Sequence, residues 1–301
     1  MTDWIAGIEG TAAGHQMAMI LALTSAVAHA LFGALQKGRH DPWLTRGAID
    51  ICYGLMALPV ALFVFPLPTP QLWAVLAGVF VIHAGYKWLL AMAYSRGAYT
   101  VVYPVVRGTA PIITVVAAGA LFHERFTPLQ WGGTALLSLA IFGLAAVNLR
   151  AATVGRAALG AALGLAVVTG ILTSLYTVYD AFGIRMAENA FTFLAWFFVV
   201  DGLGLFPWVA LARWKRMENR PAPGPLMLRG LVGGLLGFVS FGAVMLATRL
   251  DKVGEAAVLR ETSTVFAAAI GWLFLREYVG PTRAILMALI AAGAVLVEMG
   301  G

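Results

Sequence analysis

Long apolar runs separated by short polar segments dominate the chain. A helix needs about 20 apolar residues to cross a bilayer, and the sequence contains ten runs of about that length. They lie near residues 17–36, 44–65, 71–94, 99–122, 127–148, 158–180, 190–212, 226–247, 253–275 and 281–298. The runs do not alternate polar and apolar residues, as the strands of a membrane barrel do. The pattern therefore predicts an all-α integral membrane protein with ten transmembrane helices.

The composition agrees with this prediction and limits what else the chain contains. Of its 301 residues, 61% are hydrophobic and only 11% are charged, whereas soluble domains carry about 25% charged residues. The ten runs use most of the chain, so we expect no sizeable soluble domain. The sequence has no P-loop, no glycine-rich dinucleotide fingerprint and no Cys/His cluster with metal-ligand spacing. We therefore expect no ATP hydrolysis, no cofactor and no metal.

The basic residues are distributed as in a multi-pass membrane protein. The formal net charge is +6, but most lysines and arginines fall in the connections between runs, so nucleic acid is not expected as a partner. They concentrate in the odd-numbered connections, above all in RWKRMENRPAPGPLMLR (213–229). Cytoplasmic loops carry an excess of Lys and Arg. We therefore expect a protein of the cytoplasmic (inner) membrane with both termini outside.

The chain contains an internal repeat. Residues 153 positions apart match around the fourth and ninth runs, as in Arg96 and Arg249, Arg107 and Arg260, Thr109 and Thr262, Glu124 and Glu277, and Pro128 and Pro281. Charges are scarce in this chain, so matches of Arg, Glu and Pro at one offset are not expected by chance. We interpret residues 1–150 and 151–301 as two five-helix repeats. Because five is odd, the second repeat enters the membrane from the opposite side, as in many secondary transporters.

Two segments carry a resemblance to a known family. The fourth-to-fifth-run segment YPVVRGTAPIITVVAAGALFHERFTPLQWGG (103–133) and its weaker copy VLRETSTVFAAAIGWLFLREYVGPTR (258–283) resemble EamA-type members of the drug/metabolite transporter superfamily. The resemblance covers nearly the whole chain. It implies ten helices and transport of small metabolites, amino acids, nucleotide sugars or drugs. The chain departs from the pattern in having Ala257 and Thr264 where the fourth run has prolines, and family members commonly keep their termini in the cytoplasm.

Two arginines lie deep within apolar runs. Arg107 and Arg260 each fall a few residues from the middle of a run, where a charge costs about 2.5–3.5 kcal/mol unless water or an ion partner relieves it. Intramembrane ionisable residues mark transport pathways, and a guanidinium binds carboxylate or phosphate through two hydrogen bonds. We expect both arginines to face a cleft shared by the two halves and to bind the substrate. The alternative is that Arg107 pairs permanently with Asp201 or Glu261 and only holds helices together.

Other charged residues share this depth. Lys87, Asp201 and Glu261, counted together with the two deep arginines, leave one formal positive charge. One uncompensated positive charge favours an anionic group on the substrate, so we include these three residues in the predicted binding site. Arg46 and Asp50 are four residues apart on one helix face and can pair with each other.

Three tyrosines complete the predicted binding site. Tyr103 lies four residues before Arg107 and shares its helix face. Tyr176 and Tyr179 occur in the unusually polar segment TSLYTVYD (173–180) and could supply aromatic contacts to a ligand. The alternative for tyrosines in a membrane protein is anchoring at the interface.

Three further residues are secondary candidates. His29 in the first run could relay protons, the alternative being a hydrogen-bonded packing histidine. Glu124 and Glu277 match each other in the repeat and lie at the ends of their runs. We interpret these two glutamates as structural residues.

These residues predict a secondary transporter that moves a small polar metabolite, anionic or zwitterionic, by alternating access. A lipid or lipid-linked headgroup flippase of the same fold is the alternative. A membrane-embedded enzyme fits less well, because such catalysis needs clustered His, Asp or Glu residues and the five histidines form no tight motif. The expected partners are the small-molecule substrate and the lipid bilayer, and the sequence leaves a homodimer open.

Overall fold

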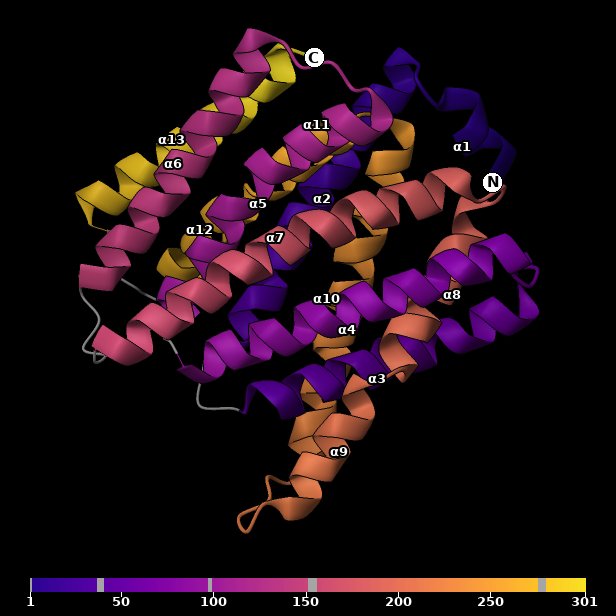
Figure 1. Cartoon of the computed structure of the whole chain (residues 1–301), viewed down its shortest axis with the longest axis vertical. Helices are drawn as coiled ribbons and strands as arrows, with labels where there is room; N and C mark the ends of the chain where they lie inside the picture. The colour runs from indigo at the N-terminus through magenta and orange to yellow at the C-terminus, as the bar shows by residue number, and fades with distance from the viewer. Residues whose placement is uncertain (1, 37–40, 97–98, 151–155, 276–279) are drawn as a thin grey trace.

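The computed structural model describes residues 2–36, 41–96, 99–150, 156–275 and 280–301, and these residues form helices and no strand (Figure 1). The helices are α1 (Thr2–Ile8), α2 (Ala12–Gln36), α3 (Pro42–Phe63), α4 (Pro70–Arg96), α5 (Tyr99–Phe122), α6 (Pro128–Arg150), α7 (Arg156–Met186), α8 (Ala190–Leu203), α9 (Phe206–Arg216), α10 (Pro223–Leu250), α11 (Val253–Arg260), α12 (Ser263–Leu275) and α13 (Pro281–Met299). The all-α prediction is confirmed.

Local sequence signals explain where many helices begin. Helices α3, α4, α6, α10 and α13 each begin at a proline, whose fixed φ and missing N–H suit the first helical position. Asp41 caps α3, since its Oδ1 accepts a hydrogen bond from the Trp43 N–H at 2.9 Å. Asn189 caps α8 in the same way, accepting from the Phe191 N–H at 2.9 Å.

Two of the predicted spans are broken helices. In the described chain, 9 helical stretches are long and apolar enough to cross a membrane, and one of these, Ala190–Arg216, consists of α8 and α9. Helices α11 and α12 are each shorter than a span, and together they cover the ninth predicted run. The break between them lies at Glu261 and Thr262, where the Glu261 N–H turns back to the Val258 carbonyl at 3.0 Å. Transporters place such discontinuous helices at substrate sites.

Helix packing follows a two-repeat architecture. When α8–α9 and α11–α12 are each counted as one span, contacts between the halves come in matched pairs: α2 packs on α10 and α4 on α7, while α5 packs on α7 and α12 on α2. Equivalent spans also pack on each other, as α3 on α8, α5 on α11, and α6 on α13. Exchanging the repeats leaves this pattern unchanged, as a two-fold relation requires.

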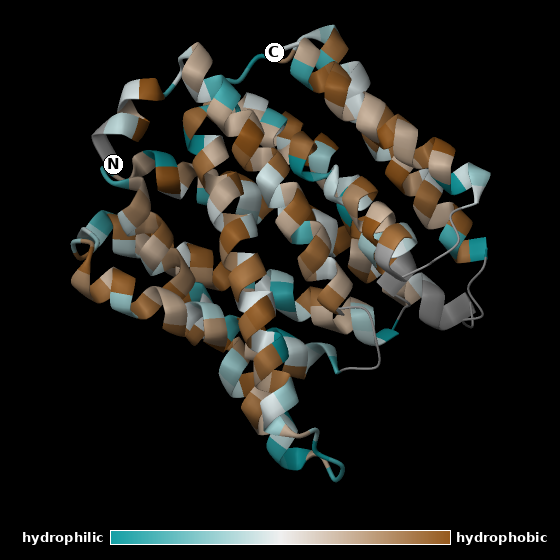
Figure 2. Cartoon of the chain, turned by 180° about the vertical axis from the view of Figure 1, so that it is seen from behind, coloured by the Kyte–Doolittle hydropathy of each residue, from teal (hydrophilic) through white to brown (hydrophobic). Residues whose placement is uncertain are grey.

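The outer surface is apolar along the bundle. Figure 2 shows hydrophobic residues along the helices and hydrophilic residues gathered at helix ends and connections. Large apolar side chains such as Leu139, 68% exposed, and Val81, 66% exposed, point outward. Lipid is the solvent that such a surface requires.

The α6–α13 contact depends on glycine. A Cβ on Gly133 would lie 2.6 Å from the Gly293 carbonyl oxygen, and a Cβ on Gly293 would lie 2.7 Å from that of Gly133. We expect Gly133→Leu to lower the free energy of unfolding in detergent by about 1–3 kcal/mol, because the two backbones must separate. Gly132→Leu is the matched control, since nothing lies within 4 Å of its Cβ position. Equal effects of the two substitutions would contradict the role of this close approach.

Candidate functional site

Arg107 on α5 is held by an ion pair between the repeats. Its guanidinium is buried, and its Nη1 lies 2.7 Å from Oε1 of Glu261. Its Nη2 contacts Nε2 of His29, and its guanidinium carbon lies 5.3 Å from the centre of the Tyr103 ring. The Tyr103 hydroxyl in turn lies 3.5 Å from Oγ of Ser263. This geometry matches the packing alternative for Arg107, in which it joins helices across the repeats.

His29 connects this ion pair to α10. Its Nδ1 lies 3.3 Å from Oγ of Ser240, and Oγ of Ser25 donates to the Ser240 carbonyl at 2.7 Å. The imidazole therefore has a neighbour at each nitrogen, as a hydrogen-bonded packing histidine does. Proton relay by His29 stays a prediction.

Arg260 differs from its repeat partner. It ends α11 and is 3% exposed, yet its side chain makes no hydrogen bond or ion pair with any described residue, and its Nε is buried without a partner. Burying an unpaired charge is costly. A permanently charged group in this state is suited to receive an anionic partner from outside the protein.

Arg260 borders a small cavity in the second repeat. The cavity has a volume of about 10 Å³, roughly the space of one water molecule. The other lining residues come from α7 and α10, and they are Tyr176, Thr177, Asp180, Phe241, Val244, Met245 and Thr248. Arg107 is not among the residues that line this cavity, so a cleft shared by Arg107 and Arg260 stays a prediction.

Asp180 brings a negative charge to the same cavity. It is buried on α7 and forms no ion pair with Arg260 among the described contacts. Instead, its Oδ2 lies 3.0 Å from Nε2 of His83 on α4. The other nitrogen of His83, Nδ1, lies 3.6 Å from Oδ1 of Asp201. Through this contact, His83 of the first repeat packs against Asp180, a residue that lines the cavity.

Sequence reasoning missed both Asp180 and His83. His83 and Asp180 are 97 residues apart, so no short sequence motif indicates their contact. Asp180 does follow Tyr176 by four residues, which places the two on one helix face. The polar character of TSLYTVYD (173–180), together with this spacing, was the signal in the sequence that could have pointed to Asp180.

Lys87 and Asp201 lie in a separate buried cluster. The Lys87 ammonium is 2.7 Å from Oδ2 of Asp50 and 2.7 Å from Oδ1 of Asp201, and it donates to the Tyr53 hydroxyl at 3.1 Å. Nε of Arg46 lies 2.7 Å from Oδ1 of Asp50, close enough for an ion pair although the two groups are not aligned as a hydrogen bond. Neither Lys87 nor Asp201 lines the cavity. Their charges are satisfied within the protein.

The charged groups of the Lys87 cluster, the Arg107 ion pair and the cavity are equal in number. The cations Arg46, Lys87, Arg107 and Arg260 match the carboxylates Asp50, Asp180, Asp201 and Glu261. The single positive charge expected from the sequence arose because that count left out Asp180. With Asp180 included, the formal charges of these groups sum to zero and do not by themselves favour a net anion as substrate.

The remaining tyrosines occupy different places. Tyr176 is 2% exposed and lines the cavity, with its ring centre 4.7 Å from that of His83 and 4.8 Å from that of Tyr86. Tyr179 lies outside the cavity, because its hydroxyl packs where a Cβ on Gly78 of α4 would be. The structure therefore brings only Tyr176 to Arg260.

Glu124 holds the start of α11. Its carboxylate accepts hydrogen bonds from the backbone N–H groups of Val253 at 2.8 Å and Gly254 at 3.2 Å, which a negative charge at a helix N-terminus favours. Its Oε1 also lies 3.2 Å from Nη2 of Arg185. Glu124 thus fixes the helix that ends at Arg260. Its repeat partner, Glu277, lies outside the described residues.

Comparison with protein families finds the EamA-like transporter family at residues 16–146 and again at residues 160–299. The chain belongs to the EamA-like transporter family. The resemblance to the drug/metabolite transporter superfamily is therefore confirmed, and this EamA-family protein is a multi-pass membrane transporter. Members of the family are transporters rather than enzymes.

No curated protein matches the chain. A solved structure described only as the crystal structure of a protein is similar to this EamA-family chain, with a TM-score of 0.72 at 17% sequence identity. The match covers 95% of this chain and 98% of the other chain. It supports the fold and says nothing about the substrate.

Proposed function

We propose that the protein is a secondary transporter that moves a small zwitterionic or anionic metabolite across the cytoplasmic membrane by alternating access. The observation that carries this proposal is the buried Arg260 guanidinium, which borders a cavity and has no partner among the described residues. Its planar fork suits a carboxylate or phosphate.

Asp180 favours a zwitterion over a simple anion. Because Arg260 and Asp180 border one cavity without pairing, a substrate carrying both charges can satisfy each of them. The carboxylate of such a substrate would bind Arg260 and its ammonium group would bind Asp180. Tyr176 and Phe241 line the same cavity and would contact an apolar substituent.

The size of the cavity and the two repeats support alternating access. A cavity of about 10 Å³ is too small for a metabolite, so in the proposed mechanism this arrangement is a closed state that opens to admit the substrate. The contacts that must change lie between residues 1–150 and 151–301, which we take as the two repeats. They include the Arg107–Glu261 ion pair and the His83–Asp180 contact. Uniport, exchange and proton coupling are all compatible with this movement. For the orientation in the membrane, we propose that both termini lie outside.

Substitution of Asp180 tests the substrate class. Purified protein in liposomes is assayed for uptake of labelled neutral amino acids, small monocarboxylates and phosphate monoesters. We expect Asp180→Asn to reduce zwitterion uptake at least about 10-fold, the value of one charge-assisted hydrogen bond, while uptake of any anion is kept. Glu218→Gln, an exposed loop carboxylate, is the control.

Two outcomes would contradict the proposal. One is equal loss of zwitterion and anion uptake by Asp180→Asn when the protein stays folded. The other is wild-type protein that moves none of these solutes but translocates labelled phospholipid, which would favour a flippase.

A further inference from the structure

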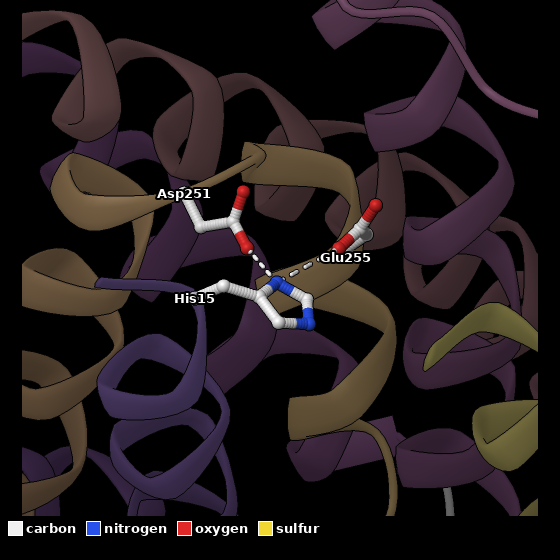
Figure 3. Close-up of side chains that lie close together, drawn as sticks. All are labelled: His15, Asp251 and Glu255. Atoms are coloured by element: carbon white, nitrogen blue, oxygen red, sulfur yellow. Dashed lines mark hydrogen bonds and ion pairs between the residues drawn. The ribbon is translucent and has the colours of Figure 1, made fainter. Parts of the chain in front are cut away.

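A second polar cluster lies at the end of the bundle that carries both chain termini, apart from the transport cavity. It joins His15 near the start of α2, Asp251 between α10 and α11, and Glu255 on α11 (Figure 3). Nδ1 of His15 contacts Oδ2 of Asp251 and lies 4.0 Å from Oε2 of Glu255. The cluster brings together segments that are 236 residues apart, which explains why no metal-ligand spacing is visible in the sequence.

We propose that His15, Asp251 and Glu255 bind a divalent transition-metal cation of the Zn²⁺ type. One nitrogen and two carboxylate oxygens, all within 4.8 Å of one another, are the donor set that such a cation takes, with a fourth position left for water. The donor atoms of a tetrahedral Zn²⁺ site lie about 3.4 Å from one another at ordinary metal–nitrogen and metal–oxygen bond lengths. Binding therefore requires only that His15 and Asp251 separate slightly and that Glu255 moves closer.

The surrounding residues orient these ligands. Nε2 of His15 lies 3.2 Å from Oε1 of Glu298; when this nitrogen carries the proton, the lone pair of Nδ1 faces the other two ligands. Oε1 of Glu255 is held by the Lys252 ammonium at 2.7 Å and by the Gln130 amide at 2.5 Å, which leaves Oε2 for the metal. Metal-binding histidines characteristically donate their second nitrogen to a carboxylate, and ligating carboxylates are themselves hydrogen-bonded.

The charge of the cluster fits a divalent cation. The carboxylates of Asp251, Glu255 and Glu298 face one ammonium, that of Lys252, so two negative charges are uncompensated while His15 is neutral. The same residues line a small cavity of about 10 Å³. The His15 side chain is 37% exposed, so a cation can reach it from water.

A bound cation would act on the transport helix. Helix α11 has only 8 residues, with Glu255 in its first turn and Arg260 at its end. His15 belongs to the first repeat, whereas Asp251 and Glu255 belong to the second. Metal binding would therefore tie α11 to α2 and stabilise the closed arrangement at this end. This inference does not depend on the identity of the transported substrate.

Metal binding is tested directly on the full-length protein in detergent, with any polyhistidine tag removed. We expect ZnCl₂ titration to show one site per chain, Co²⁺ to give the visible absorption of a low-coordinate site, and Zn²⁺ to slow amide hydrogen exchange in α11. His15→Ala and Asp251→Asn should abolish the site. Gln130→Ala should weaken it about 10- to 100-fold, as loss of an outer-shell partner does. His123→Ala, an exposed histidine, should bind like wild type.

The outcomes separate a metal site from a proton site. Absence of Zn²⁺ and Co²⁺ binding to the wild type, or unchanged binding by a folded His15→Ala variant, would overturn the proposal. If the wild-type protein binds neither metal but the rate of amide hydrogen exchange in α11 changes between pH 5 and 8, His15 is a protonation site. If His15→Ala does not fold, the Co²⁺ spectrum of the wild type still decides whether a nitrogen–oxygen site exists.

Discussion

Arg260→Ala is expected to reduce transport of the true substrate about 100-fold, while Arg107→Ala reduces it mainly through loss of folded protein. Arg260 has no partner among the described residues, so its guanidinium is available to the substrate. A charge-assisted hydrogen bond is worth about 1.5–3 kcal/mol, and two parallel ones add geometric fit. Initial rates of uptake into liposomes, normalised to folded and inserted protein, measure the effect.

The matched substitutions separate binding from stability. Arg260→Lys keeps the charge but not the planar fork, so we expect it to retain a part of the activity. Arg220→Ala removes an exposed loop arginine and should transport like wild type. Full transport by Arg260→Ala would refute the assignment of Arg260 as the substrate-binding group.

Much of the fold could be predicted from the sequence because the bilayer imposes a strong pattern. Long apolar runs specify spans, and the charged matches between Arg107 and Arg260 and between their neighbours reveal the repeat. The break at Glu261 and Thr262 was not predictable, since no proline or glycine lies between residues 255 and 270 of that run. It depends on tertiary contacts, including the pairing of Glu261 with Arg107.

The site was predictable only in part, for a related reason. The depth of a charge can be read from its run, but its partners depend on how each helix is rotated and on which helix faces it. Arg107 and Arg260 look equivalent in sequence, yet Glu261 pairs with the first, and the second faces a cavity. Lys87 and Asp201 pair with each other, and Lys87 also pairs with Asp50. Because these partners are far apart in the sequence, the pairing could not be recognised there, and both residues were assigned to the substrate site.

Lys87→Met is expected to lower the free energy of unfolding by about 3–5 kcal/mol, the typical cost of removing one partner from a buried ion pair. The Lys87 side chain is 2% exposed, and its ammonium lies 2.7 Å from carboxylate oxygens of both Asp50 and Asp201. Asp50 keeps Arg46 as a partner, whereas Asp201 loses its ammonium partner and keeps only its contacts with the Tyr53 hydroxyl and His83. Unfolding by sodium dodecyl sulfate in mixed micelles measures the difference.

A second substitution shows whether Asp201 is the cause. In Lys87→Met/Asp201→Asn the charge is removed, and the Asn carbonyl can still accept the hydrogen bond from the Tyr53 hydroxyl, so much of the lost stability should return. Arg213→Met breaks an ion pair to Asp41 of the same 2.7 Å length whose arginine side chain is 49% exposed, and it should cost only about 0–1 kcal/mol. If the double variant were no more stable than Lys87→Met alone, the cost would come from lost packing of the lysine, and burial would not explain the difference between the two ion pairs.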